Sequence, residues 1–172
     1  MMKLRTRRAM ALAGSAVALS IALTGCSTIS NLISGDAPRD EETDQVTEEA
    51  EIDIFQLKVG DCLTEEAMTG GETNTAPVIP CDEPHPYEVY YEFELEDGEF
   101  PGSAAIEAPA IEKCEAAFTE FVGLTWDEST LEYSWFEPTQ ASWDQGGDRL
   151  LQCIIYDPAD DALTGSLKGA AR

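Results

Sequence analysis

The chain of 172 residues contains a single histidine, His85, and its five cysteines never form a C-x-x-C pair. A structural zinc site, which usually takes four closely spaced cysteine and histidine ligands, is therefore not expected. The sequence also lacks a G-x-S-x-G motif, because the serine of Gly165–Gly169 stands one place too early. This spacing argues against a serine hydrolase of that class. Neither a metal nor a cofactor is expected.

Basic residues are scarce. The sequence has ten Lys and Arg against 34 Asp and Glu, a formal net charge of −24. Four basic residues and no acidic ones precede Cys26, so from Cys26 onward six basic residues face 34 acidic ones, a charge of −28. Such a surface repels phosphate backbones, which argues against nucleic acid as a partner. Basic partners and divalent cations remain compatible with it, and solubility alone is the simplest interpretation.

No apolar run is long enough for a stable transmembrane helix. Ala9–Leu23 has fifteen residues, whereas a spanning helix needs about 20, and four basic residues precede it. The run ends in Leu23-Thr24-Gly25-Cys26, which resembles a bacterial lipobox. These features predict a lipoprotein signal peptide over residues 1–25 and lipidation of Cys26, by palmitate or a similar fatty acyl group. The protein would then be anchored on the extracytoplasmic face of the cell membrane.

Residues 26–53 are predicted to form a lipidated N-terminus and an acidic, disordered tether. From Gly35 to Asp53 carboxylates dominate and apolar side chains are few. Like charges repel, and little apolar surface is available to offset the entropy of ordering. The folded domain is therefore expected to occupy residues 54–172.

Patterning after Phe55 predicts an α+β domain in which one helix packs on a small antiparallel sheet of four or five strands. Apolar residues recur at helical spacing over 104–122, with Gly123 as the C-terminal cap, and Pro109 either starts this helix or kinks it. Alternation predicts strands at the following positions: 55–63 with a bend at Gly60-Asp61, 87–95, 131–135, 149–156, and a short edge strand around 163–167.

The strand at 87–95 has the clearest alternation. Tyr87, Val89 and Tyr91 are predicted to face the core, while Glu88 and Tyr90 belong to the opposite, acidic face in water.

Four cysteines remain after Cys26, and an even number in an exported domain predicts two disulfides. Cys114 lies on the apolar stripe of the predicted helix and Cys153 on the apolar face of the last strand, so both point at the core from opposite layers. Cys114 is therefore paired with Cys153 and, by elimination, Cys62 with Cys81.

Several stretches together resemble the septum formation domain family of actinobacterial membrane proteins and lipoproteins. They are Val59–Leu63, Pro80–His85 running into Glu88-Val89, Cys114, and Trp143 followed by Gly147–Arg149 and Cys153. The resemblance covers roughly Phe55 to Lys168, and Pro86 directly after His85 departs from the usual pattern. It implies an extracytoplasmic module linked to cell division and brings no catalytic residues with it.

Two groups of residues are candidate partner-binding positions. His85 follows Asp82 and Glu83 in a proline-rich loop, where the three form either a polar site or a structural turn. Trp143 precedes Arg149, and these residue types are favoured in binding hot spots, although a structural role at the sheet edge is the alternative. The complete candidate set is Asp82, Glu83, His85, Trp143, Asp148 and Arg149.

The expected function is a non-enzymatic, membrane-anchored interaction module in envelope growth or septum formation. Its partner would be an unidentified envelope or division protein or a cell wall component. One alternative is a wall-active hydrolase, because paired carboxylates cleave glycosidic bonds, but among 34 acids a pair is uninformative. The other is a calcium- or small-ligand-binding protein, for which Asp157, Asp160 and Asp161 are the acidic cluster considered, although their spacing matches no EF-hand loop.

Overall fold

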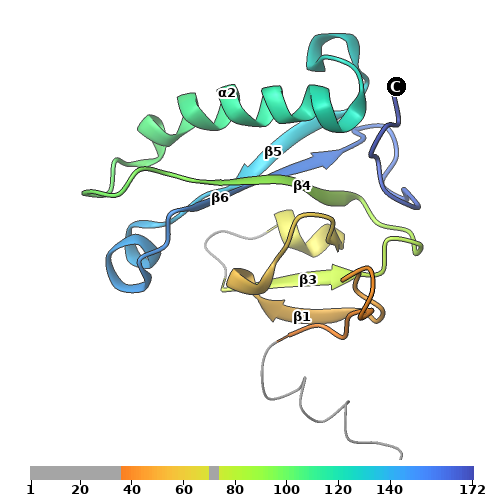
Figure 1. The fold of residues 1–172 in the computed structure, drawn as a ribbon, viewed down its shortest axis with the longest axis horizontal. Helices are drawn as coiled ribbons and strands as arrows, with labels where there is room; N and C mark the ends of the chain where they lie inside the picture. The colour runs from red at the N-terminus through yellow and green to blue at the C-terminus, as the bar shows by residue number, and fades with distance from the viewer. Residues whose placement is uncertain (1–35, 70–73) are drawn as a thin grey trace, which may run out of the picture.

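The computed structural model describes residues 36–69 and 74–172. The predicted signal peptide and the lipidation site Cys26 lie outside the described residues. Figure 1 shows one long helix, α2 (Ser103–Val122), lying across one face of a curled sheet. The six strands are β1 (Ala50–Asp53), β2 (Cys62–Leu63), β3 (Thr75–Ile79), β4 (Tyr87–Glu94), β5 (Glu132–Phe136) and β6 (Leu150–Tyr156).

The sheet order is β1-β3-β2-β4-β6-β5, and every pairing is antiparallel. The predicted α+β class is confirmed, but the sheet has six strands rather than four or five. Four short turns connect these elements: the 3-10 turns η1 (Ile54–Gln56), η2 (Glu65–Met68) and η3 (Trp126–Glu128), and the π-helical turn η4 (Ser142–Gly146). Within the described residues no helix combines the length and hydrophobicity needed to cross a bilayer.

Both faces of the sheet are covered by apolar side chains. On the helix side, Phe118 and its neighbours on α2 pack against Leu151, Cys153 and Ile155 of β6, as the sequence predicts. On the opposite side, Ile154 packs with residues of β1, β2 and β3. Because successive strand residues point to opposite faces, burial on both faces gives β6 its continuous apolar sequence.

Helix α2 agrees with its prediction at both ends. It begins at Ser103, and Gly123 ends it in the left-handed conformation with φ 90°, donating its N–H to the carbonyl of Thr119 at 3.0 Å. Pro109 lies inside the helix rather than at its start. Glycine adopts this backbone conformation without a Cβ clash, which is why it commonly follows the last helical turn.

Both predicted disulfides are confirmed. Cys62 pairs with Cys81, with a Cα–Cα distance of 5.3 Å, and Cys114 pairs with Cys153 at 5.7 Å. The second bond joins α2 directly to β6, across the buried layer between helix and sheet.

The predicted tether is wrong for residues 36–53. Ala37 and Val46 are buried, and β1 pairs with β3 so that Ile52 is fully buried. Arg39 reaches into the domain, where its guanidinium donates two hydrogen bonds to the buried carboxylate of Asp61, at 2.7 and 2.8 Å. A few apolar side chains are enough to order this segment, because β1 pairs with the edge of the sheet formed by β3. The folded unit therefore includes residues from Asp36 onward.

The first predicted strand, 55–63, is wrong over residues 55–59. The carboxylate of Asp53 accepts a hydrogen bond from the Phe55 N–H at 2.9 Å and caps the turn η1 in place of a strand. Phe55 is 53% exposed and Val59 47% exposed, so the alternation in this segment does not mark a core-facing strand. Only the end of the predicted segment, β2, belongs to the sheet.

Strand β4 has a bulge between Val89 and Tyr91 that reverses its faces. Tyr87 and Val89 pack on the side away from the helix, whereas Tyr91 packs on the helix side. Tyr90 is buried and donates its hydroxyl to the carbonyl of Cys114 at 2.8 Å. The predicted exposure of Glu88 and Tyr90 is therefore wrong, because an extra residue in one strand shifts the alternation. The predicted edge strand at 163–167 is reduced to one bridge, between His85 and Leu163.

Candidate functional site

The His85 loop does not bring its three candidate residues into one site. His85 is fully buried, its Nδ1 lies 2.8 Å from the carbonyl oxygen of Glu83, and its backbone N–H donates to Leu163. The side chains of Asp82 and Glu83 are exposed. Within the described residues, Nε2 of His85 has no hydrogen-bond partner. The histidine thus anchors the C-terminal segment instead of facing solvent with the carboxylates.

Glu88 is a buried carboxylate beside this loop that the sequence interpretation placed in water. It accepts hydrogen bonds from Ser166 Oγ at 2.6 Å and from the Leu167 N–H at 2.7 Å. Burial raises its pKa, although these two hydrogen bonds and the nearby His85 and Lys168 act in the opposite direction. Glu88 and His85 together attach the last ten residues to the start of β4.

Trp143 and Arg149 are in contact. The Arg149 guanidinium carbon lies 3.6 Å from the centre of the Trp143 ring. The indole N–H donates to the carbonyl of Gly98 at 2.9 Å, and Arg149 forms an ion pair with Asp97 at 2.8 Å. Because Arg149 bonds to its carboxylate, the pKa of Asp97 is lowered. The pair therefore clamps turn η4 to the loop between β4 and α2.

This clamp leaves little of Trp143 available to a partner. The side chain is only 3% exposed, and Asp148 is engaged with Ser142 Oγ at 2.9 Å and with the Leu150 N–H at 3.0 Å. Trp143 is therefore too deeply buried to act as a hot-spot residue in direct contact with a partner. However, residues in and next to this clamp line two hollows, one that includes Trp143 and one that includes Asp148.

The larger hollow, which we call the Trp143 groove, has a volume of about 380 Å³ and lies between β4 and the N-terminal half of α2. This volume falls within the range of small-ligand pockets, about 300 to 1,000 Å³. Its apolar wall is formed by Phe93, Leu95, Pro101, Ala105, Ile106, Pro109 and Trp143. Its charged residues are Glu94, Glu96, Glu99 and Lys113.

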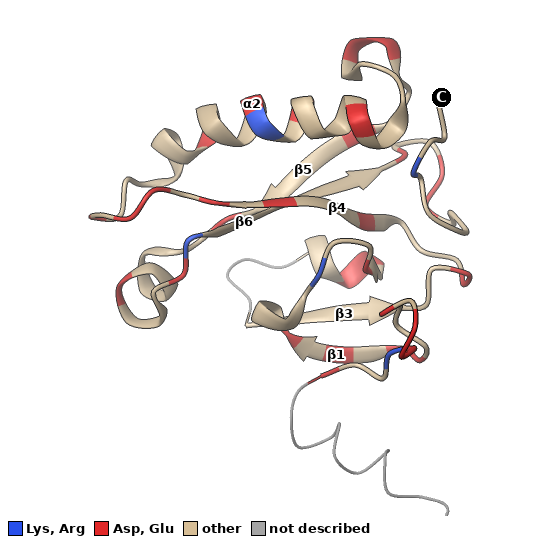
Figure 2. Cartoon of the chain, in the orientation of Figure 1, with Lys and Arg blue, Asp and Glu red and all other residues tan. Residues whose placement is uncertain are grey.

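The three glutamates of the Trp143 groove are exposed, whereas Lys113 lies with its ammonium 5.3 Å from the centre of the Phe93 ring. Lys113 also lines a smaller neighbouring hollow of about 290 Å³ that continues along the same side of α2. Together they form an apolar depression with a predominantly acidic rim. Figure 2 shows that acidic residues are spread along the chain while basic ones are few.

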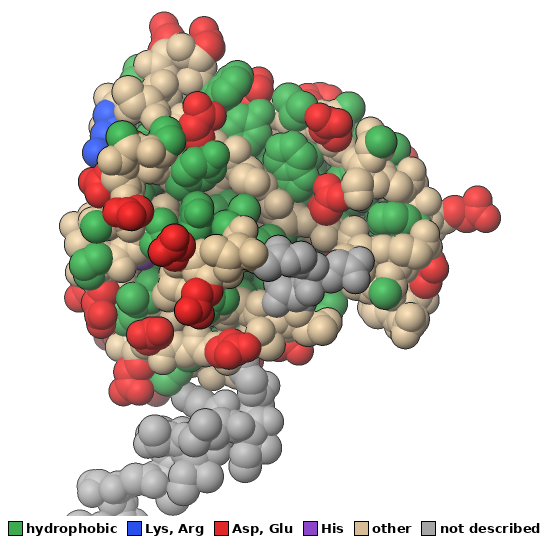
Figure 3. All heavy atoms as spheres, turned by 180° about the vertical axis from the view of Figure 1, so that it is seen from behind, with side chains coloured by type: hydrophobic (Ala, Val, Ile, Leu, Met, Phe, Trp, Pro, Cys, Tyr) green, Lys and Arg blue, Asp and Glu red, His purple; other side chains and the backbone are tan. Residues whose placement is uncertain are grey.

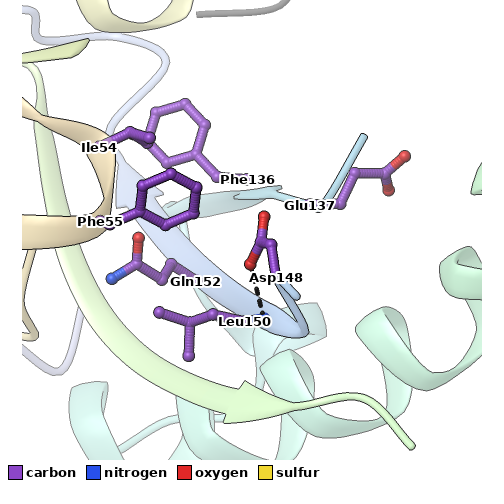
Figure 4. Close-up of a pocket in the computed structure, with 7 residues that line it drawn as sticks. All are labelled: Ile54, Phe55, Phe136, Glu137, Asp148, Leu150 and Gln152. Atoms are coloured by element: carbon purple, nitrogen blue, oxygen red, sulfur yellow. Dashed lines mark hydrogen bonds between the residues drawn. The ribbon is translucent and has the colours of Figure 1, made fainter. Parts of the chain in front are cut away.

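The second hollow beside η4 lies on the other face of the sheet and is shown in Figure 4. Ile54, Phe55 and Phe136 gather on one side of it, and Asp148 bonds to Leu150 beneath them. Its volume is only about 40 Å³. A space of this size holds a water molecule or two rather than an organic ligand.

Three aromatic side chains, Trp126 in the turn η3 and Tyr133 and Trp135 on β5, remain at least partly exposed. Trp126 is 38% exposed, and Tyr133 and Trp135 are half-buried against the helix side of the sheet. Among the three tryptophans, Trp143, which the sequence analysis took as a candidate binding residue, is the one that is buried.

The acidic cluster after β6 is used internally. Asp157 accepts from the Ala159 N–H and pairs with Arg172 at 3.3 Å, and Asp160 accepts from the Ala162 N–H. Across residues 36–69 and 74–172, no group of three or more histidine, cysteine or acidic side chains is arranged to hold a metal ion.

The family model described as "Septum formation" matches residues 57–172, so the chain belongs to the septum formation family. Two Mycobacterium tuberculosis proteins named "Uncharacterized membrane protein", from strains CDC 1551 / Oshkosh and H37Rv, are each 29% identical over 122 residues. The match covers 64% of this chain and 26% of each relative, so the chain spans about a quarter of their length. No solved structure matches it significantly.

Proposed function

We propose that this chain is a lipid-anchored, extracytoplasmic module that binds an envelope partner during septum formation and acts without catalysis. Membership of the septum formation family supports the division role. The lipobox-like sequence ending in Cys26 and the membrane-protein names of the two relatives support the anchor.

The observation that carries the binding role is the Trp143 groove. An apolar wall contributes affinity through burial of apolar surface, and exposed carboxylates at the rim favour basic groups on the ligand. The matching ligand is a protein segment with an apolar anchor residue beside a lysine or arginine. The clamp between Trp143 and Arg149 acts by holding the two sides of the groove in place.

Photo-crosslinking in living cells of the native host tests this role. Ala105 lines the groove, whereas its neighbour Ala104 is also exposed on α2 but lies outside it. A crosslinking amino acid at position 105 is expected to capture one defined envelope protein, and the same group at position 104 is expected to capture it poorly. Equal capture from both positions, or none from position 105, would contradict the groove as the docking site.

The hydrolase alternative is tested separately with purified peptidoglycan. The proposal expects no release of muropeptides by the full chain. Release that disappears when one named carboxylate is replaced by its amide would favour the enzyme instead. For the calcium alternative, the proposal expects no change in the melting temperature when millimolar calcium is added.

A further inference from the structure

Strand β5 and the preceding turn η3 carry aromatic side chains whose polar atoms are each bonded to a carboxylate. Trp126 Nε1 donates to Glu132 at 2.9 Å, the Tyr133 hydroxyl donates to Glu115 at 2.8 Å, and Trp135 Nε1 donates to Glu137 at 2.9 Å. The rings also contact one another, with centroids 5.7 Å apart for Trp126 and Tyr133 and 6.4 Å apart for Tyr133 and Trp135. We call this set the β5 strip: Glu115, Trp126, Glu132, Tyr133, Trp135 and Glu137.

These bonds fix the rings before any ligand arrives. Each aromatic side chain has its single polar atom satisfied and at least one ring neighbour, so little side-chain freedom remains to be lost on binding. The bonds also place carboxylates at the ring edges. Aromatic faces and carboxylates both attract cations, so the strip is suited to lysine and arginine side chains.

The backbone of β5 is available on one side. β5 is an edge strand of the sheet, and among the described residues its backbone hydrogen bonds go to β6 alone. An uncovered edge of this kind is a template for another strand. Natural proteins usually protect such edges with lysine, proline or a bulge, and none of these occurs within Glu132–Phe136.

The charge of the β5 strip determines which kind of strand can pair with the free edge of β5. If β5 paired with β5 of a second copy of this chain, Glu132 and Glu137 of one molecule would lie close to the same two residues of the other. The chain as a whole also carries a net charge of −24. Pairing of like charges across a strand interface is unfavourable. On the side of the molecule shown in Figure 3, acidic side chains surround hydrophobic ones and basic side chains are confined to one margin. The occupant must therefore carry the opposite charge.

We propose that the β5 edge binds an extended, basic segment of another protein, which adds a seventh strand to the sheet. Alternate lysine or arginine side chains of that segment would lie on the helix side, over the rings of Tyr133 and Trp135 and near Glu115 and Glu137. This surface is distinct from the Trp143 groove, because β5 lies beyond β6 and the groove borders β4. The inference therefore does not depend on the proposed function.

Binding of a labelled peptide to the full chain in detergent tests the proposal, with fluorescence anisotropy as the readout. The probe is a short peptide that alternates arginine and valine, and its affinity is expected to fall as salt is added. Replacing both Trp126→Ala and Glu137→Gln is expected to weaken binding about tenfold. The matched control is Asp127→Asn, which removes one exposed charge from the same region but none of the three carboxylates that bond to the rings. Circular dichroism verifies that each variant is folded.

A second pair of peptides tests strand addition directly. A strand presents the N–H groups of alternate residues to opposite edges, so methylating the amides of the arginines and those of the valines blocks different edges. One methylated peptide should lose binding and the other should keep it. The proposal is overturned if both bind, if the double variant binds normally, or if a peptide with glutamate in place of arginine binds equally well.

Discussion

At the scale of single residues, the most consequential side chain is Glu88. Glu88 is 2% exposed, and its carboxylate holds the C-terminal segment through Ser166 and Leu167, close to the buried His85. A buried carboxylate with its pKa above the usual 4.5 binds its proton more tightly in the folded state than in the unfolded state. Folding is therefore favoured by protonation of Glu88, and its contribution to stability declines as pH rises through the raised value.

This predicts a pH signature for Glu88→Gln. The variant loses one hydrogen-bond acceptor at all pH values, but it cannot ionise. Starting below pH 4.5, the wild-type free energy of unfolding should fall relative to that of the variant as pH rises. Urea titrations of both proteins across this range measure the difference. A difference that is constant with pH, or one that changes in the opposite direction, would contradict the assigned pKa direction.

At the scale of elements, the disulfide between Cys114 and Cys153 holds α2 on the sheet. It closes a longer loop than the bond between Cys62 and Cys81, with sequence separations of 39 and 19. Replacing both cysteines of the longer loop by alanine should cost about 4 kcal/mol, against about 3 kcal/mol for the shorter loop. Guanidinium unfolding of the two double variants checks this order. A smaller loss for Cys114→Ala/Cys153→Ala would contradict the role assigned to this bond.

The elements that sequence analysis located correctly are those decided by their own periodicity. The helix predicted at 104–122 is observed at Ser103–Val122, and the strands predicted at 131–135 and 149–156 are observed within one residue at each end. The disulfide pairing followed from the faces of these same elements. Local pattern is sufficient where apolar spacing and a capping glycine agree.

The features that sequence analysis missed depend on distant partners. The bulge in β4 accompanies pairing of Val89 with Gly60 and Asp61, and Glu88 is buried because residues 166 and 167 donate to it. The contact between Trp143 and Arg149 was not predicted from the sequence. Nor was the groove beside them, since its walls come from β4, the following loop and α2.

At the scale of the whole molecule, the folded unit is larger than the matched family region. The family model covers residues 57–172, yet β1 and Arg39 lie before it. Asp61 is 2% exposed and bonded to Arg39, so removing the arginine leaves a buried carboxylate without its counter-charge. Breaking a buried ion pair in this way is strongly destabilising.

A fragment of residues 57–172 should therefore be less stable than one of residues 36–172. This loss of stability should exceed the loss caused by the single change Arg39→Ala within the longer fragment. That single change is expected to cost about 3 kcal/mol. Thermal unfolding followed by circular dichroism compares the three proteins. Equal melting temperatures for the two fragments would contradict the inclusion of residues 36–56 in the domain.

The central claim is that this protein is held at the membrane and reaches the division site through its Trp143 groove. The most direct measurement is fluorescence imaging of the tagged full chain in dividing cells of the native host. The chain should concentrate at the septum, and the variant Glu94→Lys/Glu96→Lys/Glu99→Lys should remain at the membrane but spread evenly around the cell. Even distribution of the unaltered chain, or unchanged septal enrichment of the variant, would contradict the claim.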